Sequence, residues 1–261
     1  SHSAAYAYVA YQTAYLKANY TAEYMAALIS LNQGNTDDVV MYMDESRRMG
    51  LAILEPDVNK SDLHFIVEDD KTLRFSIGGI KGVGEKAVEL LVAERKAGGP
   101  FKDLHGFCDR IDTRSVNKAC LESMIRAGAF DALAGPAGRA QLIAAVEEAM
   151  ARGASARRDR VSGQGNLFES LGGEEAVVSK LPEVAAWDEP RKLEEEKKVL
   201  GFYLSGHPMA DWREFAEGLS STRSLKALAT IPDGLEVVVG AYINAVQQKI
   251  TRNKGEKMAV L

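Results

Sequence analysis

The sequence of 261 residues lacks several features that mark whole classes of protein. It has no run of about 18 apolar residues and no charged-then-apolar leader, so it predicts neither a membrane span nor a secretory signal. Two cysteines, Cys108 and Cys120, give no disulfide framework, and together with His105 they fall short of a zinc ligand set. We therefore expect a cytoplasmic protein with buried thiols, no bound cofactor and no metal site in this chain.

Positive charge is also scarce, with 32 basic against 37 acidic residues, a net charge of −5 and a pI near 5.5. This balance argues against a protein that covers nucleic acid with its whole surface, so any DNA contact must be local. The four histidines have no catalytic partner at a typical spacing, and the acidic residues form no paired-carboxylate motif. No catalytic residue is predicted in this chain.

Helical periodicity dominates the sequence that remains. Helices are expected over 4–19, 21–31, 36–49, 84–97, 102–110, 115–127 and 137–151. Short apolar runs at 51–54, 63–67 and 72–77 predict a small sheet between the two groups of helices. The fold class is therefore multidomain and mainly α, with small β elements.

The first helix carries a stripe of tyrosines, Tyr8, Tyr11 and Tyr15, on one face. We expect this stripe to pack in a core, with stacking on nucleic-acid bases as the alternative. Thr21 is expected to cap the second helix.

The composition changes after residue 151. Residues 152–181 are expected to form an exposed loop, and 191–203 a charged helix. Strands over 235–250 and 256–261 are joined by a basic turn that carries Arg252 and Lys254. This pattern resembles the opening hairpin of an OB-fold, whose first loop contacts single-stranded nucleic acid, although any β-hairpin would look alike.

A glycine-rich turn follows the predicted sheet and reads Ile80-Lys81-Gly82-Val83-Gly84-Glu85-Lys86. Its two glycines allow a tight turn, so that local amides and the N-terminus of the next helix can face one anion. The pattern resembles the helix-hairpin-helix element, which holds the DNA backbone without reading sequence. We predict DNA contacts from Lys81, Gly82, Val83, Gly84 and Lys86.

Two other interpretations of this turn stay open. Gly82-x-Gly84-x-x-Ala87 after a strand fits a dinucleotide-binding fingerprint, but no second buried strand with a terminal acidic residue follows the helix. The turn could also be purely structural. Residues 115–130 resemble a second, degenerate helix-hairpin-helix half that lacks the Gly-x-Gly turn, which makes phosphate binding there doubtful.

A short apolar peptide lies in the predicted loop, Gln164-Gly165-Asn166-Leu167-Phe168. Glycines on both sides leave Leu167 and Phe168 without a local helix or strand to cover them, so a partner protein is expected to do so. The peptide resembles the motif with which bacterial DNA polymerases bind the sliding clamp. A surface turn with two buried anchors is the alternative.

Four arginines, Arg152, Arg157, Arg158 and Arg160, precede this peptide. Such a cluster is usually solvated, and it could also add salt-dependent affinity for passing DNA.

The order of the motifs along the chain closely resembles the alpha subunit of bacterial DNA polymerase III. The matching stretches are Ser1-His2-Ser3 with Tyr11-Gln12-Thr13, Asp44-Glu45 before Arg48-Met49-Gly50-Leu51, Ile80 to Gly84, Ala127 to Asp131, Gln164 to Phe168, Leu200 to Pro208 and the terminal basic hairpin. The resemblance implies the end of the polymerase fingers over 1–70, a tandem helix-hairpin-helix region over 71–151, a linker over 152–181 with the clamp-binding peptide 164–168, a helical connector over 182–234 and the start of an OB domain over 235–261.

The same resemblance implies a piece of a DNA-directed DNA polymerase that does not catalyse alone, because the palm aspartates that hold two Mg²⁺ ions lie outside this chain. It places Ser1 and His2 near the incoming nucleotide. The implied partners are duplex primer-template DNA, the sliding clamp, single-stranded DNA at the OB domain and other replicase subunits. Gly165 and Asn166 depart from the usual clamp motif, which affects affinity. A non-enzymatic DNA-repair or scaffold module and a nicotinamide-dependent enzyme remain as alternatives.

Overall fold

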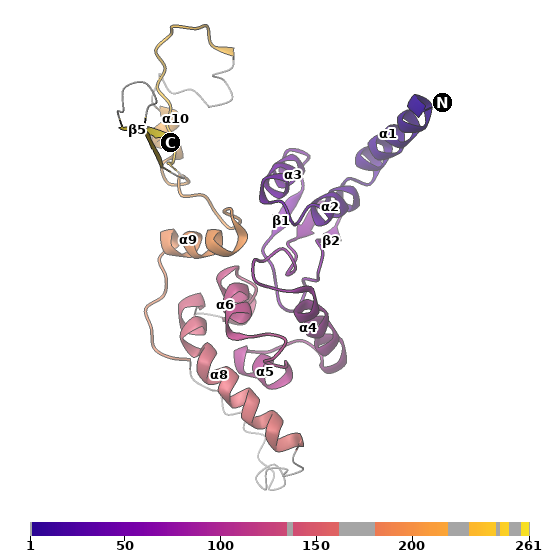
Figure 1. Ribbon diagram of the computed structural model, residues 1–261, viewed down its shortest axis with the longest axis vertical. Helices are drawn as coiled ribbons and strands as arrows, with labels where there is room; N and C mark the ends of the chain where they lie inside the picture. Colours follow the sequence, from indigo (N-terminus) through magenta and orange to yellow (C-terminus); the bar gives the residue numbers. More distant parts are fainter. Residues whose placement is uncertain are drawn as a thin grey trace. The chain divides into compact units, whose positions relative to one another are not determined.

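A computed structural model describes residues 2–134, 138–161, 181–218, 230–243, 246–250 and 257–260. The chain divides into two compact units, Ser1–Ser205 and Gly206–Leu261. Helices make up most of the described residues and the strands are short, which confirms the mainly α fold with small β elements (Figure 1). No helix in the described ranges is long and apolar enough to cross a membrane.

Three helices begin the first unit: α1 (His2–Asn19), α2 (Thr21–Leu31) and α3 (Thr36–Arg48). Asn35 caps α3 by accepting a hydrogen bond from the Asp37 amide at 3.1 Å. The predicted cap of α2 was wrong, because Thr21 is the first helical residue and its hydroxyl instead donates to the Lys17 carbonyl at 2.9 Å.

The tyrosine stripe of α1 is exposed, so the expected core packing was wrong. Tyr8 is 64% exposed, Tyr11 68% and Tyr15 50%. Figure 1 shows α1 leading away from α2. Helical spacing predicted the face correctly, but it could not say whether another element would cover it.

A three-stranded sheet follows, formed by β1 (Ala52–Leu54), β2 (Ile66–Asp69) and β3 (Thr72–Arg74) in the order β1-β3-β2. β2 and β3 of the predicted sheet form an antiparallel hairpin, and in its turn the Lys71 amide donates to Asp69 Oδ1 at 2.8 Å. β1 pairs with β3 in parallel, with Ile53 opposite Leu73. The sheet leads directly into the glycine-rich turn.

A helical module then packs around aromatic side chains. It consists of α4 (Glu85–Gly98), α5 (Leu104–Arg110), α6 (Lys118–Arg126), α7 (Asp131–Ala134) and α8 (Gly138–Val161). Phe107 joins the core by edge-to-face contacts with Phe101, at 4.9 Å, and Phe130, at 5.1 Å. All three rings are buried.

Helix α8 runs to Val161 and so includes the first part of the segment expected to be a loop. Its contacts with α5 explain the extension. Gly153 lies so close to α5 that a β-carbon there would overlap the Cys108 carbonyl. Arg157 donates to the carbonyls of Cys108 and Ile111 at the end of α5.

Helix α9 (Glu189–Leu200) ends the first unit. Asp188 caps its N-terminus by accepting from the Arg191 amide at 3.0 Å, and Gly201 ends it with a φ of +92°. The helix packs against α6. The region expected as a connector over 182–234 is therefore divided between the two units.

The second unit contains α10 (Arg213–Gly218), β4 (Gln247–Ile250) and β5 (Lys257–Val260). β4 and β5 pair antiparallel, with Gln247 opposite Val260 and Ile250 opposite Lys257. The regular strand is shorter than the expected 235–250.

Candidate nucleic-acid interface

The glycine-rich turn is a tight hairpin between the sheet and α4. Ile80 is buried and anchors it, and the Val83 amide donates to the Ile80 carbonyl at 3.1 Å. Gly82 has a φ of +84°, which side-chain-bearing residues rarely adopt, so glycine is required there. The hairpin is thus anchored by the buried side chain of Ile80 and closed by a hydrogen bond of its own backbone.

The outer face of the hairpin is open. Gly82, Gly84 and Lys86 are exposed, and nothing lies within 4 Å of a β-carbon built on Gly84. Gly84 is the N-cap of α4 and provides no side-chain bond, so the first amides of the helix remain available to an anion. Glu85 is the one acidic residue in the first turn of α4 and opposes an anion there.

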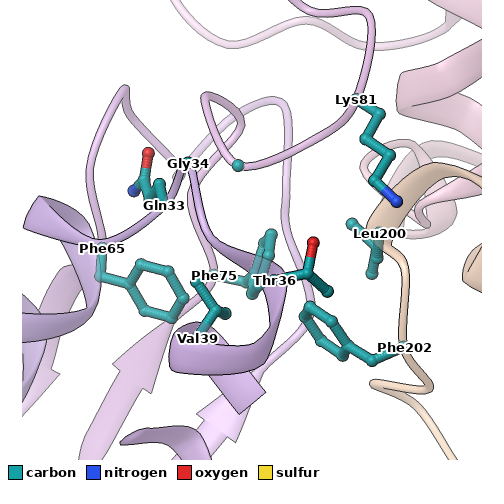
Figure 2. A pocket seen from close by; sticks show the side chains of 10 residues that line it. Gln33, Gly34, Thr36, Val39, Phe65, Phe75, Lys81, Leu200 and Phe202 are labelled. Carbon is teal, nitrogen blue, oxygen red and sulfur yellow. The ribbon is translucent and has the colours of Figure 1, made fainter. Parts of the chain in front are cut away.

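The side chains of Lys86 and Lys81 lie in different surroundings and suit different roles. Lys86 is exposed on the first turn of α4 and has no ion-pair partner in the described part of the chain. The Lys81 side chain extends toward Leu200 at the end of α9 (Figure 2). A β-carbon on Gly201 would lie 2.8 Å from Lys81 Nζ. Because the C-terminus of a helix attracts a cation, the Lys81 ammonium is favourably placed beside the end of α9. In this position it points away from the open face of the hairpin.

Helix α9 supports the hairpin through contacts that the sequence did not reveal. The Lys81 amide donates to the Val199 carbonyl at 2.9 Å. Glu195, buried in α9, forms an ion pair with Arg126 of α6 and another with Lys198 at 2.7 Å. Burial alone would raise the pKa of Glu195, but these pairs outweigh it and hold that pKa below its ordinary value. Lys198 also lies 3.5 Å from Glu194, which is four residues earlier on the same helix.

The second hairpin, between α6 and α7, is closed by the protein itself. Gly128 has a φ of +92°, as Gly82 has its positive φ, but Arg139 of α8 lies against it. The Arg139 side chain donates to both Asp131 oxygens, at 2.6 to 3.0 Å, and to the Arg126 carbonyl at 2.9 Å. A guanidinium therefore stands where a phosphate would have to approach.

Arg139 also faces a buried carboxylate. Its Nη1 is 3.6 Å from Oε2 of Glu196, a residue with 0% exposure. The other oxygen of Glu196 accepts the amides of Leu204 and Ser205, which fold back after α9. Nearby, burial raises the pKa of Glu55. These groups join α8, α9 and the second hairpin into one body.

Comparison with known proteins matches both hairpins to one family model. Residues 50–142 match the model described as a helix-hairpin-helix motif. The whole chain is similar to "DNA polymerase III subunit alpha" of Caulobacter vibrioides, with 39% identity over 259 residues, 99% of this chain. The subunits of Vibrio cholerae and Escherichia coli K12 are 40% and 37% identical over 100% of it.

The chain belongs to the DNA polymerase III alpha-subunit family. It spans 22% of the length of each of these relatives and is a segment of such a subunit. The match to 50–142 confirms the helix-hairpin-helix interpretation of the turn at Gly82. In the alpha-subunit segment, α4 is followed by α5 and not by a second buried strand, so the dinucleotide-binding alternative lacks its structural context.

Several residues singled out in the sequence fall beyond the described ranges of this alpha-subunit segment. These are Ser1, the side chain of His2, the peptide residues Gln164, Leu167 and Phe168, and the turn residues Arg252 and Lys254. Their predicted roles stay predictions.

Two arginines of the cluster form ion pairs, and the side chain of Arg160 lies outside the described residues. Arg152 pairs with Asp109 at 3.2 Å, and Arg157 pairs with Asp112 at 3.0 Å. Arg158 is exposed, and its charge adds to the surface at the end of α8. Two of the four arginines therefore hold α8 on α5, a role that a basic run in the sequence does not reveal.

Both cysteines are buried, as expected, and burial raises the pKa of Cys108 to about 12 and that of Cys120 to about 11. Burial also lowers the pKa of His105. In the ranges that the structure covers, no three His, Cys, Asp or Glu side chains gather into a group that could hold a metal ion.

Proposed function

We propose that this segment holds duplex DNA and the sliding clamp for a replicative DNA polymerase. Three observations support it: similarity to alpha subunits over the whole chain, the helix-hairpin-helix match, and an open hairpin that begins a helix without a side-chain cap. The open hairpin is the observation on which the proposal of DNA binding depends. The nucleotidyl transfer itself belongs to the whole subunit.

The first hairpin binds a phosphate of the duplex backbone. Amides near Gly82 and Gly84 face the phosphate oxygens, and Lys86 supplies positive charge from the first turn of α4. Contacts of this kind position a protein on DNA without specifying its sequence, as a replicative polymerase requires. The second hairpin holds the module together through Arg139 and takes no phosphate.

Mg²⁺ in such a polymerase is bound by palm carboxylates, which we place outside this chain. The described residues do not fit a catalytic metal, since they gather no suitable group of ligands. We derive no catalytic step for this segment. By family resemblance alone, Ser1 and His2 lie near the incoming nucleotide.

The peptide Gln164 to Phe168 binds the sliding clamp, with Leu167 and Phe168 in an apolar cleft and Gln164 at its edge. A tethered polymerase rebinds its primer end at high effective concentration, and this raises processivity. The hairpin of β4 and β5 opens an OB domain, where Arg252 and Lys254 contact single-stranded DNA. The surrounding replicase subunits are further partners, in the cytoplasm. A stand-alone repair or scaffold module is disfavoured, because similarity to the polymerase subunit continues over the whole chain.

Duplex binding is tested by fluorescence anisotropy with several unrelated primer-template sequences. We expect Lys86→Ala to weaken binding by a similar factor for every sequence, since a phosphate contact is lost. Lys96→Ala is the matched control, because Lys96 is exposed in the last turn of the same helix. Equal effects of the two changes, or an effect on one DNA sequence only, would contradict a backbone grip at the hairpin.

Clamp binding is tested separately in a pull-down with the sliding clamp. Leu167→Ala with Phe168→Ala should abolish capture and leave the circular dichroism spectrum and duplex affinity unchanged. Undiminished capture of the double variant would reject the peptide as the clamp-binding element.

A further inference from the structure

A small cavity opens beside the first hairpin, between α3, the sheet and the end of α9 (Figure 2). Its wall contains three phenylalanine rings. Phe65 and Phe75 meet edge to face with centroids 4.9 Å apart, and Phe202 lies 5.9 Å from Phe75. Val39 and Leu200 complete the apolar lining.

The rim of the cavity carries a cation and a hydroxyl. Figure 2 shows the Lys81 ammonium and the Thr36 hydroxyl among the groups that line it. A β-carbon on Gly201 would lie 2.8 Å from both Lys81 Nζ and Thr36 Cγ2, so the two side chains converge there. Lys81 forms no ion pair with any residue described. An anionic group at this rim would complete a pair that the protein leaves open.

The volume of the cavity limits the size of its ligand. It is about 120 Å³, slightly smaller than the roughly 150 Å³ of an apolar cavity that holds benzene. Sites for drug-sized molecules are larger, from about 300 Å³ upward. One aromatic ring fits inside, with its substituent at the rim, and a fused ring system does not.

The walls are fixed before any ligand arrives. Gln33 Nε2 and the Gly79 amide both donate to Ser76 Oγ, at 2.9 and 3.2 Å. The Phe65 amide donates to Ser30 Oγ at 3.0 Å. A preformed pocket avoids the cost of ordering its own side chains when it binds.

We propose that this cavity binds a small aromatic carboxylate. The ring lies against Phe75 and Phe202, and the carboxylate accepts hydrogen bonds from Lys81 Nζ and the Thr36 hydroxyl. The wall of three phenylalanine rings favours an aromatic ring in the ligand, and the ammonium at the rim favours a negatively charged group on it.

Benzoate, the simplest such compound, tests the site on the whole 261-residue chain by ligand-observed NMR. We expect saturable binding with a dissociation constant on the order of 1 mM, and nuclear Overhauser contacts to the Phe202 ring. Lys81→Met should raise that constant about tenfold, because the charged partner is lost. Lys86→Met should leave it unchanged, since Lys86 lies on α4 outside the cavity.

Benzyl alcohol is the uncharged control and should bind the wild-type chain and Lys81→Met equally. Absence of saturable benzoate binding would overturn the proposal. Equal losses in the two lysine variants would overturn the role of Lys81.

The cavity site and the proposed DNA function are independent of each other. Because the Lys81 ammonium already lies at the cavity and away from the open face of the hairpin (Figure 2), saturating benzoate should leave duplex affinity unchanged. A loss of duplex affinity under saturation would contradict this position of Lys81. If benzoate binds as expected and the chain binds no duplex, the DNA function fails and the cavity site stands. If the chain binds duplex and no benzoate, the cavity site fails and the DNA function stands.

Discussion

The guanidinium of Arg139 occupies the space beside Gly128 in which a side chain would begin. At Gly82, the glycine of the first hairpin with a similar positive φ, a β-carbon would meet only Ser123 Oγ at 3.4 Å, and one on Gly84 would meet nothing within 4 Å. Two hairpins of one family motif thus differ in what lies against them. The first can receive a phosphate, and the second receives a side chain of the protein.

Arg139→Met should lower the free energy of unfolding by about 3 kcal/mol or more, because Asp131 and the fully buried Glu196 lose their cationic partner. Urea denaturation monitored by circular dichroism measures this. Arg158→Met in the same helix is the control and should change stability by less than about 0.5 kcal/mol. Similar stabilities for the two variants would mean that Arg139 does not hold the second hairpin.

Gly153→Ala should destabilise the first unit by about 1–3 kcal/mol, because its methyl group would overlap the Cys108 carbonyl and separate α8 from α5. Gly106→Ala is the matched control within α5. A β-carbon there meets only Asp103 Oδ1 at 3.4 Å, so helix propensity should stabilise that variant by up to about 1 kcal/mol. Thermal melts of both variants check the opposite signs.

Gly84→Ala separates stability from DNA binding. Gly84 has an ordinary φ of −82° and open space around it, so the variant should lose less than about 1 kcal/mol of stability. Its methyl group should nevertheless keep a phosphate from the helix amides and weaken duplex binding. Gly82→Ala should instead cost about 1–2 kcal/mol, because an alanine is strained at a φ of +84°. Full duplex affinity in a folded Gly84→Ala variant would exclude these amides as the contact.

Acid should loosen α9 through Glu195. Because the pKa of Glu195 is lower in the folded state than in the unfolded chain, its ion pairs contribute stability above about pH 4.3, which is lost as pH falls through the folded pKa. Glu195→Gln should therefore be less stable at pH 7 and lose less on acidification below about pH 4.3. Denaturation midpoints measured from pH 7 to pH 3 test this, and parallel curves for both proteins would contradict it.

The sequence predicted the elements better than their contacts. Gly82 and Gly84 after an apolar strand and before a helical run identified the first hairpin, because backbone freedom at those positions has a local signature. The caps at Asn35 and Asp188 are local too, because each side chain accepts a hydrogen bond from an amide two or three residues ahead. Each of these features involves residues that are close in the chain.

Long-range pairs had no such signal. Glu195 and Glu196 belong to a charged run that predicts a solvated helix, yet both are buried against Arg126 and Arg139. The arginine-rich composition after residue 151 predicted a loop. No residue nearby in the sequence indicates that Arg157 would instead reach the carbonyls that end α5. The spacing of the tyrosines correctly predicted the helix α1 but wrongly predicted that their face is buried. Periodicity defines a face of a helix and not the element that packs against it.

The salt dependence of duplex binding tests the central claim most directly. Plotted as log affinity against log salt, wild-type binding should fall steeply, and Lys86→Ala should reduce the slope by about 1, because one counterion-releasing phosphate contact is removed. Lys96→Ala should keep the wild-type slope. An unchanged slope in Lys86→Ala, or an equal reduction in Lys96→Ala, would show that the hairpin at Gly82 does not hold the DNA backbone.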